Sequence, residues 1–273
     1  MCGRCFSRRG FMAAVGAAGL AGCSENAATG RKQLVLVDDA QLAGFADQAW
    51  NEVVAKVPPV ADPAAHARLA RIGAPLVKAS GRDDLNWSFT VLDSPELNAF
   101  VLPNGKVGFF RGLLALAGSD DEVASVLGHE VGHVIARHSA ERMSQEVAVN
   151  AGVAIAQMLI AEEAGQWTDE IGAALGVGAA LGVILPYSRK HELEADRVGV
   201  DLMRKAGKDP AAAIRFWERM VERSAEAPKP PEVISTHPAD DKRLEALKAA
   251  VASRPLDGQG QNAKRSPPSG PGA

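Results

Sequence analysis

The chain contains 273 residues, of which 47% are hydrophobic, 23% are charged and 5% are aromatic, and its formal net charge is −3. This composition is typical of a globular protein with one sizeable core or two small ones, and the scarcity of aromatic residues disfavours a large all-β sandwich. We expect no nucleic acid as a partner, because the charge balance provides no strongly basic face.

The first 22 residues have the features of a lipoprotein signal peptide. A basic pair, Arg8 and Arg9, precedes an apolar run over 11–21 that is too short to span a bilayer, and L-A-G-C follows, ending at Cys23. This ending resembles the bacterial lipobox, in which cleavage occurs before the cysteine and lipid is attached to it. The Arg pair resembles the twin-arginine export motif, so export by the Sec or the twin-arginine route fits.

Processing at this point has consequences for the cysteines and for location. Cys2 and Cys5 would leave with the signal peptide, so we expect neither a disulfide nor a cysteine metal site. Acyl chains on Cys23 contribute about 0.8 kcal/mol per buried CH₂ and would hold the protein at a bilayer. Ser24 follows the cysteine, and by resemblance to lipoprotein sorting rules it favours the periplasmic face of the outer membrane.

Hydrophobic periodicity predicts two helices and three strands in the first half of the chain. Residues 23–38 are expected to form a lipidated tether, followed by helices over 39–57 and 63–80. Strands are expected over 87–92, 99–102 and 106–110, and Asn104-Gly105 predicts a hairpin turn between the last two.

The second half of the chain is predicted to be helical. Ser119 and Glu122 form a capping box, and the helix that they open should run to about Met143. The further helices are expected over 147–163, 169–185, 189–205, 210–223 and 240–251. The apolar stretch within 171–185 is short for a span and favours the arm of a helical hairpin, packed or facing a membrane. We predict an α+β, predominantly helical domain over 39–252 and a disordered tail over 253–273.

An H-E-x-x-H motif lies within the helix after Ser119. His129 and His133 are one helical turn apart, so both imidazoles can bind one ion. Glu130 lies at the edge of the same face, where its carboxylate can take a proton from water that the ion has acidified. Gly132 would let another backbone approach closely. The metzincin extension is excluded, because its further Gly and His positions hold Ala136 and Ser139.

A third metal ligand is expected about 60 residues further along the chain. Glu192 and Asp196 are spaced i,i+4 and share a helix face, whereas Glu194 points nearly the other way. A ligand with a second carboxylate one turn away suits a metal site, so we select Glu192 as the ligand. Asp196 would orient a ligand histidine or protonate the leaving amine. Glu194 and His191 are expected on a solvated face.

These motifs resemble the membrane-associated zinc metallopeptidase family of HtpX, BepA and LoiP. The resemblance covers most of residues 40–250, and its motifs are D-S-P-E-L-N-A-F at 93–100, P-N-G at 103–105, G-L-L at 112–114, H-E-x-x-H with A-R-H after it, E-x-x-A-D at 192–196, and T-H-P at 236–238 with Arg243 beyond. The short segment after Arg243 leaves no room for the helical-repeat domain of BepA, so the chain is more similar to LoiP-like lipoproteins. The family implies one Zn²⁺ per chain, bound by His129, His133 and Glu192, with Glu130 as general base and Asp196 assisting.

Three further features are expected near the metal. The segment Asn98, Ala99, Phe100 and Val101 resembles the family's edge strand, to which an extended substrate can add by main-chain hydrogen bonds. His237 could stabilise the oxyanion, occupy the fourth zinc position in a resting state, or anchor its loop. Arg243 would fix that loop or pair with a carboxylate. His138 and His66 are left as surface or core histidines.

The sequence therefore predicts a membrane-anchored zinc metalloendopeptidase. By family analogy, its substrates are misfolded or misassembled cell-envelope proteins in a quality-control role. Two alternatives remain open at this point: a metal-stabilised lipoprotein that binds such clients without cleaving them, and a protease that His237 holds latent. The intact Glu130 argues against the first, because zinc retention alone does not require that carboxylate.

Overall fold

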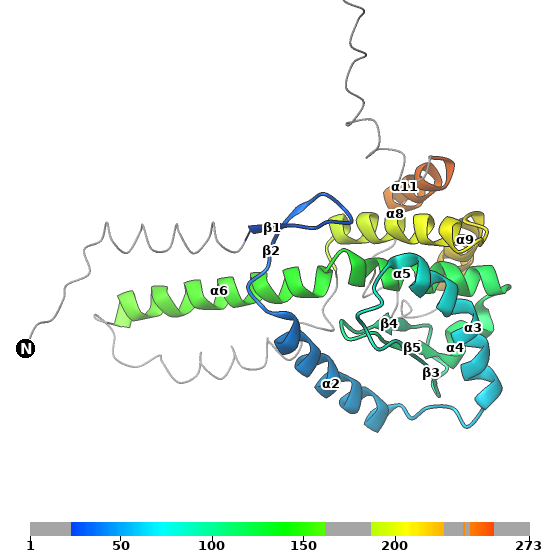
Figure 1. Ribbon diagram of the computed structural model, residues 1–273, viewed down its shortest axis with the longest axis horizontal. Coiled ribbons are helices and arrows are strands. Elements are labelled where there is room, and N and C mark those ends of the chain that lie inside the picture. The colour runs from blue at the N-terminus through cyan, green and yellow to red at the C-terminus, as the bar shows by residue number, and fades with distance from the viewer. Residues whose placement is uncertain (1–22, 162–186, 227–236, 238–240, 254–273) are drawn as a thin grey trace, which may run out of the picture.

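The computed structural model describes residues 23–161, 187–226, 237 and 241–253. Its elements are, in chain order, β1 (Cys23–Glu25), β2 (Lys32–Leu34), α2 (Asp39–Lys56), α3 (Pro63–Ser80), β3 (Ser88–Leu92), β4 (Ala99–Val101), β5 (Lys106–Phe110), α4 (Arg111–Leu116), α5 (Asp120–Ile135), α6 (His138–Ala161), α8 (Arg189–Lys205), α9 (Ala211–Glu226) and α11 (Asp241–Ala252). Figure 1 shows α5 and α8 side by side above a small sheet, with α6 projecting from the body. The predicted α+β, mostly helical architecture is confirmed.

Local signals set most helix ends where we predicted them. The side chain of Asp38 accepts from the N–H of Gln41 at the start of α2, and Gln41 reciprocates in a capping box. The side chain of Ser119 accepts from the N–H of Glu122 at the start of α5, while Glu122 reaches back to the N–H of Gly118. The helix ends are therefore determined by caps that short-range sequence encodes.

The predicted hairpin belongs to a three-stranded sheet with the order β3-β5-β4. Strands β4 and β5 pair antiparallel around the Asn104-Gly105 turn, where Gly105 has φ 88°, and β3 pairs parallel with β5. Strand β4 is thus at the edge of the sheet, as expected. Helix α5 packs against β4, so this edge lies beside the motif helix.

The crossing of α5 and α8 depends on three glycines. A Cβ at Gly132 would lie 2.7 Å from the carbonyl oxygen of Ala195 on α8, and a Cβ at Gly128 would lie 3.1 Å from that of Gly199. A Cβ at Gly199 would in turn be 2.9 Å from the backbone of Gly128. The close approach that we predicted at Gly132 is therefore present, and it brings the first turns of α8 against the H-E-x-x-H motif.

The motif helix is shorter than we predicted. It ends at Ile135 rather than near Met143, and α6 runs continuously from His138 to Ala161 instead of starting at 147. Between them Arg137 has φ 54°, a left-handed conformation that ends an α-helix and that a non-glycine residue adopts rarely. The guanidinium of Arg137 pairs with Asp39 of α2. A tertiary contact thus accompanies a break that the sequence does not signal with Gly or Pro.

The segment that we expected to be a tether begins with a folded hairpin. Strands β1 and β2 pair antiparallel, and side chains of the hairpin contact α5, α6 and α8. Asn26 donates to the carbonyl oxygen of Ile135 at 3.0 Å, and Gln33 donates to that of Ala136 at 2.5 Å. The tether interpretation is therefore corrected for residues 23–34. The prediction failed because polar residues were assumed to be solvated, whereas Asn26 and Gln33 donate hydrogen bonds to backbone carbonyls that the end of α5 leaves unpaired.

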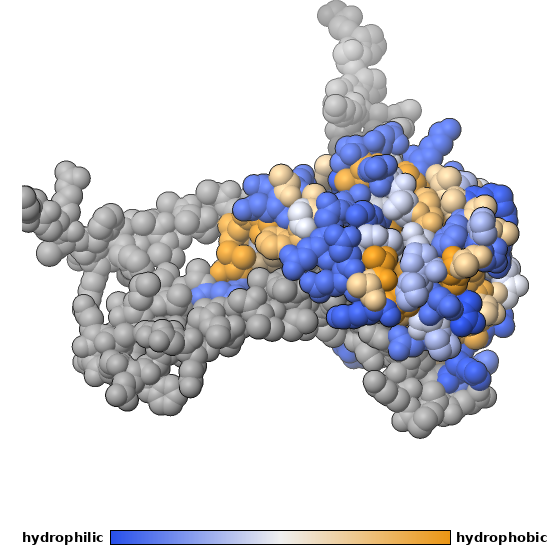
Figure 2. All heavy atoms as spheres, turned by 90° about the horizontal axis from the view of Figure 1, so that it is seen from below, coloured by the Kyte–Doolittle hydropathy of each residue, from blue (hydrophilic) through white to orange (hydrophobic). Residues whose placement is uncertain are grey.

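The core lies between the sheet, α3, α5, α8, α9 and α11, and includes the fully buried Leu69, Phe109, Leu127 and Met203. Figure 2 shows a body surface that is largely hydrophilic, with hydrophobic residues exposed on the side where α6 leaves it. Among the helices of the described ranges, none is both long and apolar enough to cross a membrane. The predicted signal peptide, the 171–185 stretch and residues 254–273 of the predicted tail lie outside the described residues.

Candidate active site

The two motif histidines are buried and point to the same place. The Nε2 atoms of His129 and His133 are 3.0 Å apart, as the i,i+4 spacing on α5 predicted. Helix α8 supplies the third group: one carboxylate oxygen of Glu192 is 3.4 Å from Nε2 of His129, and the other is 3.5 Å from Nε2 of His133. Glu192 is fully buried. Glu194 is not part of this cluster, in agreement with the choice made from helix geometry.

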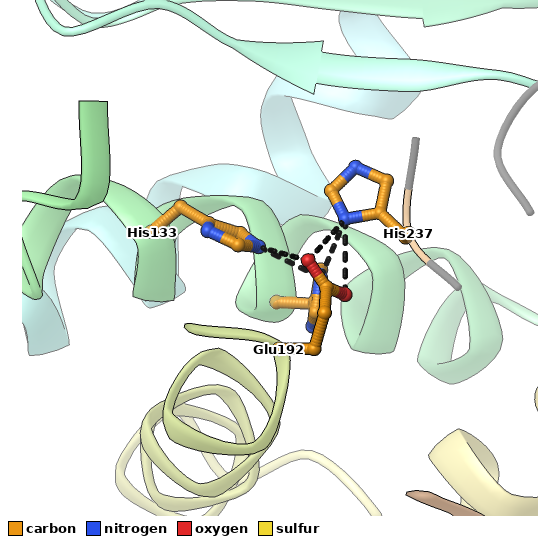
Figure 3. A group of neighbouring side chains, drawn as sticks. His133, Glu192 and His237 are labelled. Atoms are coloured by element: carbon orange, nitrogen blue, oxygen red, sulfur yellow. Dashed lines mark hydrogen bonds and ion pairs between the residues drawn. The ribbon is translucent and has the colours of Figure 1, made fainter. Parts of the chain in front are cut away.

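His237 joins the cluster from a distant part of the chain. Its Nδ1 atom lies 3.1 Å from a carboxylate oxygen of Glu192 and 3.2 Å from Nε2 of His129. Figure 3 shows Glu192 reaching up from α8 toward His133 on one side and His237 on the other. Of the three roles considered for His237, this position corresponds to the fourth metal ligand.

The four donors have the spacing of a coordination sphere. Zinc bound tetrahedrally at about 2.0–2.1 Å from its ligands requires ligand atoms about 3.3 Å apart. His129 and Glu192 lie 3.0–3.5 Å from each of their neighbours in the cluster, and all four ligand atoms lie within 4.8 Å of one another. With the Nδ1 atoms of both motif histidines hydrogen-bonded elsewhere, their Nε2 lone pairs face each other and a carboxylate. Such a set of buried donors could bind a metal ion.

The electrostatics also favour a positive charge at this point. Burial alone would lower the pKa of His129, but the hydrogen bond and charge of Asp196, together with Glu192, raise it to about 9. Burial, and then the neighbouring charge of His129, lower the pKa of His133 well below its ordinary value. The cluster therefore accommodates a proton on one histidine in the absence of an ion, and a cation can take the place of that proton.

Asp196 and Arg243 contact His129 on the side that faces away from the cluster. Asp196 Oδ1 accepts from Nδ1 of His129 at 2.8 Å, and its two oxygens accept from Arg243 at 2.8 Å and 2.9 Å. Arg243 also pairs with Glu192 at 2.7 Å and donates to the backbone oxygen of His237 at 3.2 Å. Both roles that we considered for Arg243 are thus present together. Burial would raise the pKa of Asp196, but Arg243 and His129 lower it, so its carboxylate stays ionised.

Glu130 lies at the edge of the cluster and outside its coordination set. Its side chain is buried, and one of its oxygens is 3.5 Å from Nε2 of His237. Burial raises the pKa of Glu130, although the charges of His237 and His129 oppose the effect. A buried carboxylate of raised pKa beside a metal site has the properties of a proton acceptor in catalysis.

One of the histidines that we had set aside, His138, contacts the site. His138 is fully buried, and its Nδ1 atom is 2.9 Å from Nδ1 of His133. Its Nε2 atom is 2.9 Å from Glu194, whose side chain is 14% exposed. The expected solvated face is wrong for both residues of α8: His191 is buried and Glu194 is partly buried, because the hairpin and α6 cover this side of the helix. His66 accepts from the backbone of Val91 and contacts Val60 instead.

Tyr187 is a further neighbour that sequence reasoning missed. Its ring stacks on His133 with the centroids 3.9 Å apart, and Arg142 lies over its face at 4.4 Å. Its hydroxyl contacts Ser139 at 3.0 Å. The short Y-S sequence before α8 gave no signal, because the stacking on His133 depends on the packing of α8 against α5.

The edge strand β4, which packs against α5, has backbone groups that do not pair with β5. In β4, Asn98, Phe100 and Leu102 are the positions that hydrogen-bond to β5. The alternation of an antiparallel ladder turns the N–H and C=O groups of Ala99 and Val101, which are buried, away from β5. A cavity of about 270 Å³ lies next to His133, between α2, the β4–β5 turn and the start of α6.

The sequence comparisons decide the family. The profile described as Peptidase family M48 matches residues 63–251. The chain belongs to peptidase family M48. This membership confirms the resemblance drawn from the motifs.

Three curated relatives represent the matches. The chain is 36% identical over 206 residues to the mitochondrial metalloendopeptidase OMA1 of Schizosaccharomyces pombe, which covers 74% of this chain and 59% of that protein. It is 31% identical over 239 residues to OMA1 of Homo sapiens, covering 80% of this chain and 44% of that protein. It is 29% identical over 196 residues to the beta-barrel assembly-enhancing protease of Yersinia pestis, covering 71% of this chain and 40% of that protein. The chain therefore spans less than two thirds of the length of these relatives.

Proposed function

We propose that this M48 family member is a zinc metalloendopeptidase that hydrolyses peptide bonds. The observation that carries the proposal is the buried convergence of His129, His133 and Glu192 on one point, with Glu130 beside them. Relatives named as metalloendopeptidases or as a protease support the same chemistry. The soft-to-borderline nitrogen donors with one carboxylate suit Zn²⁺ better than Mg²⁺ or Ca²⁺, which prefer oxygen ligands.

The roles of the residues follow from their positions. Zn²⁺, when bound, would polarise the scissile carbonyl and acidify a water molecule. Glu130 would accept the proton of that water and pass it to the leaving nitrogen, for which its raised pKa is suited. Asp196 would hold His129 in the tautomer that presents Nε2 to the ion. We assign it this positioning role rather than that of proton donor, because both of its oxygens accept hydrogen bonds from charged or ligand groups.

An extended and unfolded polypeptide is the substrate that this site would accept. The backbone groups of Ala99 and Val101 that β5 leaves unpaired would pair with a substrate strand through main-chain hydrogen bonds, which discriminate little between side chains. Native globular proteins rarely offer such a segment, whereas misfolded or misassembled envelope proteins do. This preference would suit a quality-control protease.

We propose that the protein is anchored to the cell envelope through a lipid on Cys23. The support is the order of basic pair, short apolar run and L-A-G-C in the sequence. The experiment is palmitate labelling and membrane fractionation of the wild type and of Cys23→Ala. Continued labelling and membrane association of Cys23→Ala would contradict the anchor.

The proteolytic activity has a direct test. Casein and an unfolded porin are incubated with the purified wild type and with Glu130→Gln, which keeps the size of the side chain but removes the base. We expect cleavage by the wild type and at least a 100-fold loss in the variant, as is typical for removal of a general base. Cleavage that survives Glu130→Gln would contradict the mechanism. Client binding without cleavage by wild type and variant alike would favour the rival binding-protein function.

The position of His237 favours a second possibility, that the protease is latent until this residue leaves the cluster. Its Nδ1 is within 3.2 Å of both His129 and Glu192, where it would occupy the position that a substrate carbonyl or water needs. The test adds His237→Ala to the same assay. Cleavage by His237→Ala that exceeds that of the wild type supports latency, whereas a loss supports a direct catalytic role for His237.

A further inference from the structure

A second chain of hydrogen bonds leads away from the cluster through His133. Nδ1 of His133 is 2.9 Å from Nδ1 of His138, and Nε2 of His138 is 2.9 Å from Oε2 of Glu194. His138 is fully buried, and the side chains of His133 and Glu194 are 2% and 14% exposed. This path is separate from the one that runs from His129 to Asp196 and Arg243.

Only one arrangement of protons satisfies this chain when His133 binds an ion. Because Nε2 of His133 faces the cluster, its lone pair must be free and the proton must be on Nδ1. That proton is then donated to Nδ1 of His138, which accepts. His138 carries its own proton on Nε2 and donates it to the carboxylate of Glu194. A carboxylate thus sets the tautomer of a ligand histidine through an intervening imidazole.

The N-terminal hairpin β1–β2 holds the end of this chain. Nε of Arg31 donates to Oε2 of Glu194 at 2.8 Å, the same oxygen that accepts from His138. Nη1 of Arg31 donates to Glu141 on α6 at 2.8 Å, so one guanidinium joins α6 to α8. The side chain of Arg31 is only 14% exposed. An ion pair so well covered is more rigid and less screened by salt than a surface pair.

The same hairpin also fixes the end of the motif helix. The amides of Asn26 and Gln33 donate to the carbonyl oxygens of Ile135 and Ala136, the last residues before the break at Arg137. His133 lies in this last turn of α5, two residues before Ile135. The hairpin therefore acts on His133 in two ways, through its side-chain tautomer and through the backbone that carries it.

We propose that the hairpin over 23–34 is a positioning element of the metal site, in which Arg31 orients His133 through Glu194 and His138. This inference rests on the proposed function, because it assigns a further role within the same site. It also changes the meaning of the N-terminal segment. The residues next to the predicted lipid attachment are part of the active-site support and not a passive spacer.

The experiment measures metal binding separately from activity. Zn²⁺ affinity of the full chain, purified in detergent, is determined by competition with a chromophoric chelator, and the visible spectrum of the Co²⁺-loaded protein reports ligand geometry. The variants are Arg31→Ala, His138→Phe and Glu194→Gln. The matched control is Arg68→Ala, which removes a partly exposed ion pair to Asp120 in the first turn of α5, nine residues before His129.

We expect each of the three variants to weaken Zn²⁺ binding by about 10- to 100-fold, as loss of an outer hydrogen-bond partner typically does, and to alter the Co²⁺ spectrum. The double variant Arg31→Ala with Glu194→Gln should weaken binding by less than the product of the two single effects, because both residues act on the same path of hydrogen bonds to His133. The Arg68→Ala control should bind Zn²⁺ like the wild type.

Two outcomes separate this inference from the proposed function. If the wild type binds Zn²⁺ and cleaves casein, but Arg31→Ala changes only the melting temperature and matches Arg68→Ala in affinity and spectrum, the hairpin is a structural fastening and the inference is wrong. If the wild type itself binds no Zn²⁺, or cleaves nothing while His237→Ala is also inactive, the proposed function fails and the inference fails with it.

Discussion

Replacing Gly132 by alanine tests whether the close packing of α5 on α8 builds the metal site. A Cβ at this position would lie 2.7 Å from the carbonyl oxygen of Ala195 and 3.2 Å from its Cα atom. Both are backbone atoms in the middle of a helix, so they cannot rotate aside. The added methyl group can be accommodated only if the two helices separate locally.

The size of the effect follows from this geometry. A carbon–oxygen contact needs about 3.3 Å, so the helices must move apart by roughly 0.6 Å. Overpacking of this kind costs about 1–3 kcal/mol, and the better helix propensity of alanine returns at most about 1 kcal/mol. We expect Gly132→Ala to lower the free energy of unfolding by about 1–2 kcal/mol. That loss corresponds to a decrease of about 2–8 °C in melting temperature for a domain of this size.

The displacement should also reach the site. Ala195 is three residues from Glu192 on α8, so a shift of α8 carries the third ligand away from His129 and His133. A misplacement of this order can cost about 100-fold in activity. The measurements are thermal unfolding with and without Zn²⁺, and casein cleavage.

The chain offers a matched control for this substitution. Gly44 lies within α2, and a Cβ there would meet nothing within 4 Å. Gly44→Ala should therefore stabilise the protein by about 0.5–1 kcal/mol and leave cleavage unchanged. If Gly132→Ala were as stable and active as Gly44→Ala, the argument that backbone contact between α5 and α8 sets the site would be refuted.

Three further predictions concern the site itself. Asp196→Asn should weaken Zn²⁺ binding by about 10- to 100-fold in chelator competition, because the amide cannot fully replace the carboxylate that accepts from His129 and Arg243; unchanged affinity would contradict the positioning role. Glu130 must be deprotonated to accept a proton, and burial raises its pKa, so kcat/KM should fall on acidification at a pH above the ordinary glutamate value of 4.5; a profile that stays flat to pH 4.5 would exclude it as the base. Chelation should lower the melting temperature and Zn²⁺ should restore it, since an ion at 1,000 times its Kd stabilises by about 4 kcal/mol; an unchanged melting temperature would indicate that no metal is bound.

Much of the fold was predictable because its signals are local. The limits of α3 and α8, the β4–β5 hairpin and the cap at Ser119 all follow from periodicity, capping residues and the Asn104-Gly105 turn. The choice of Glu192 over Glu194 also followed from sequence, because a difference of two positions on a helix reverses the direction of a side chain.

The assignments that failed depend on what packs against a helix. Glu194 was expected on a solvated face, yet His138 and Arg31 cover it. Residues 23–34 were expected to be a tether, yet their amides satisfy the end of α5. The break at Arg137, where φ is 54°, was missed because no Gly or Pro marks it in the sequence. In each case the deciding partner is distant in sequence.

The sequence alone therefore predicted the centre of the candidate site: two histidines one turn apart, Glu130 beside them, and Glu192 on another helix as the third candidate ligand. The directions of these side chains are set within single helices, because the spacing of two residues along a helix fixes the angle between their side chains. Only the tertiary structure decided how the ligands are held, with Asp196 and Arg243 behind His129, and His138, Glu194 and the N-terminal hairpin behind His133. The physical reason is that hydrogen bonds to a ligand's outer nitrogen come from whichever segment folding brings there, and no periodicity records that choice.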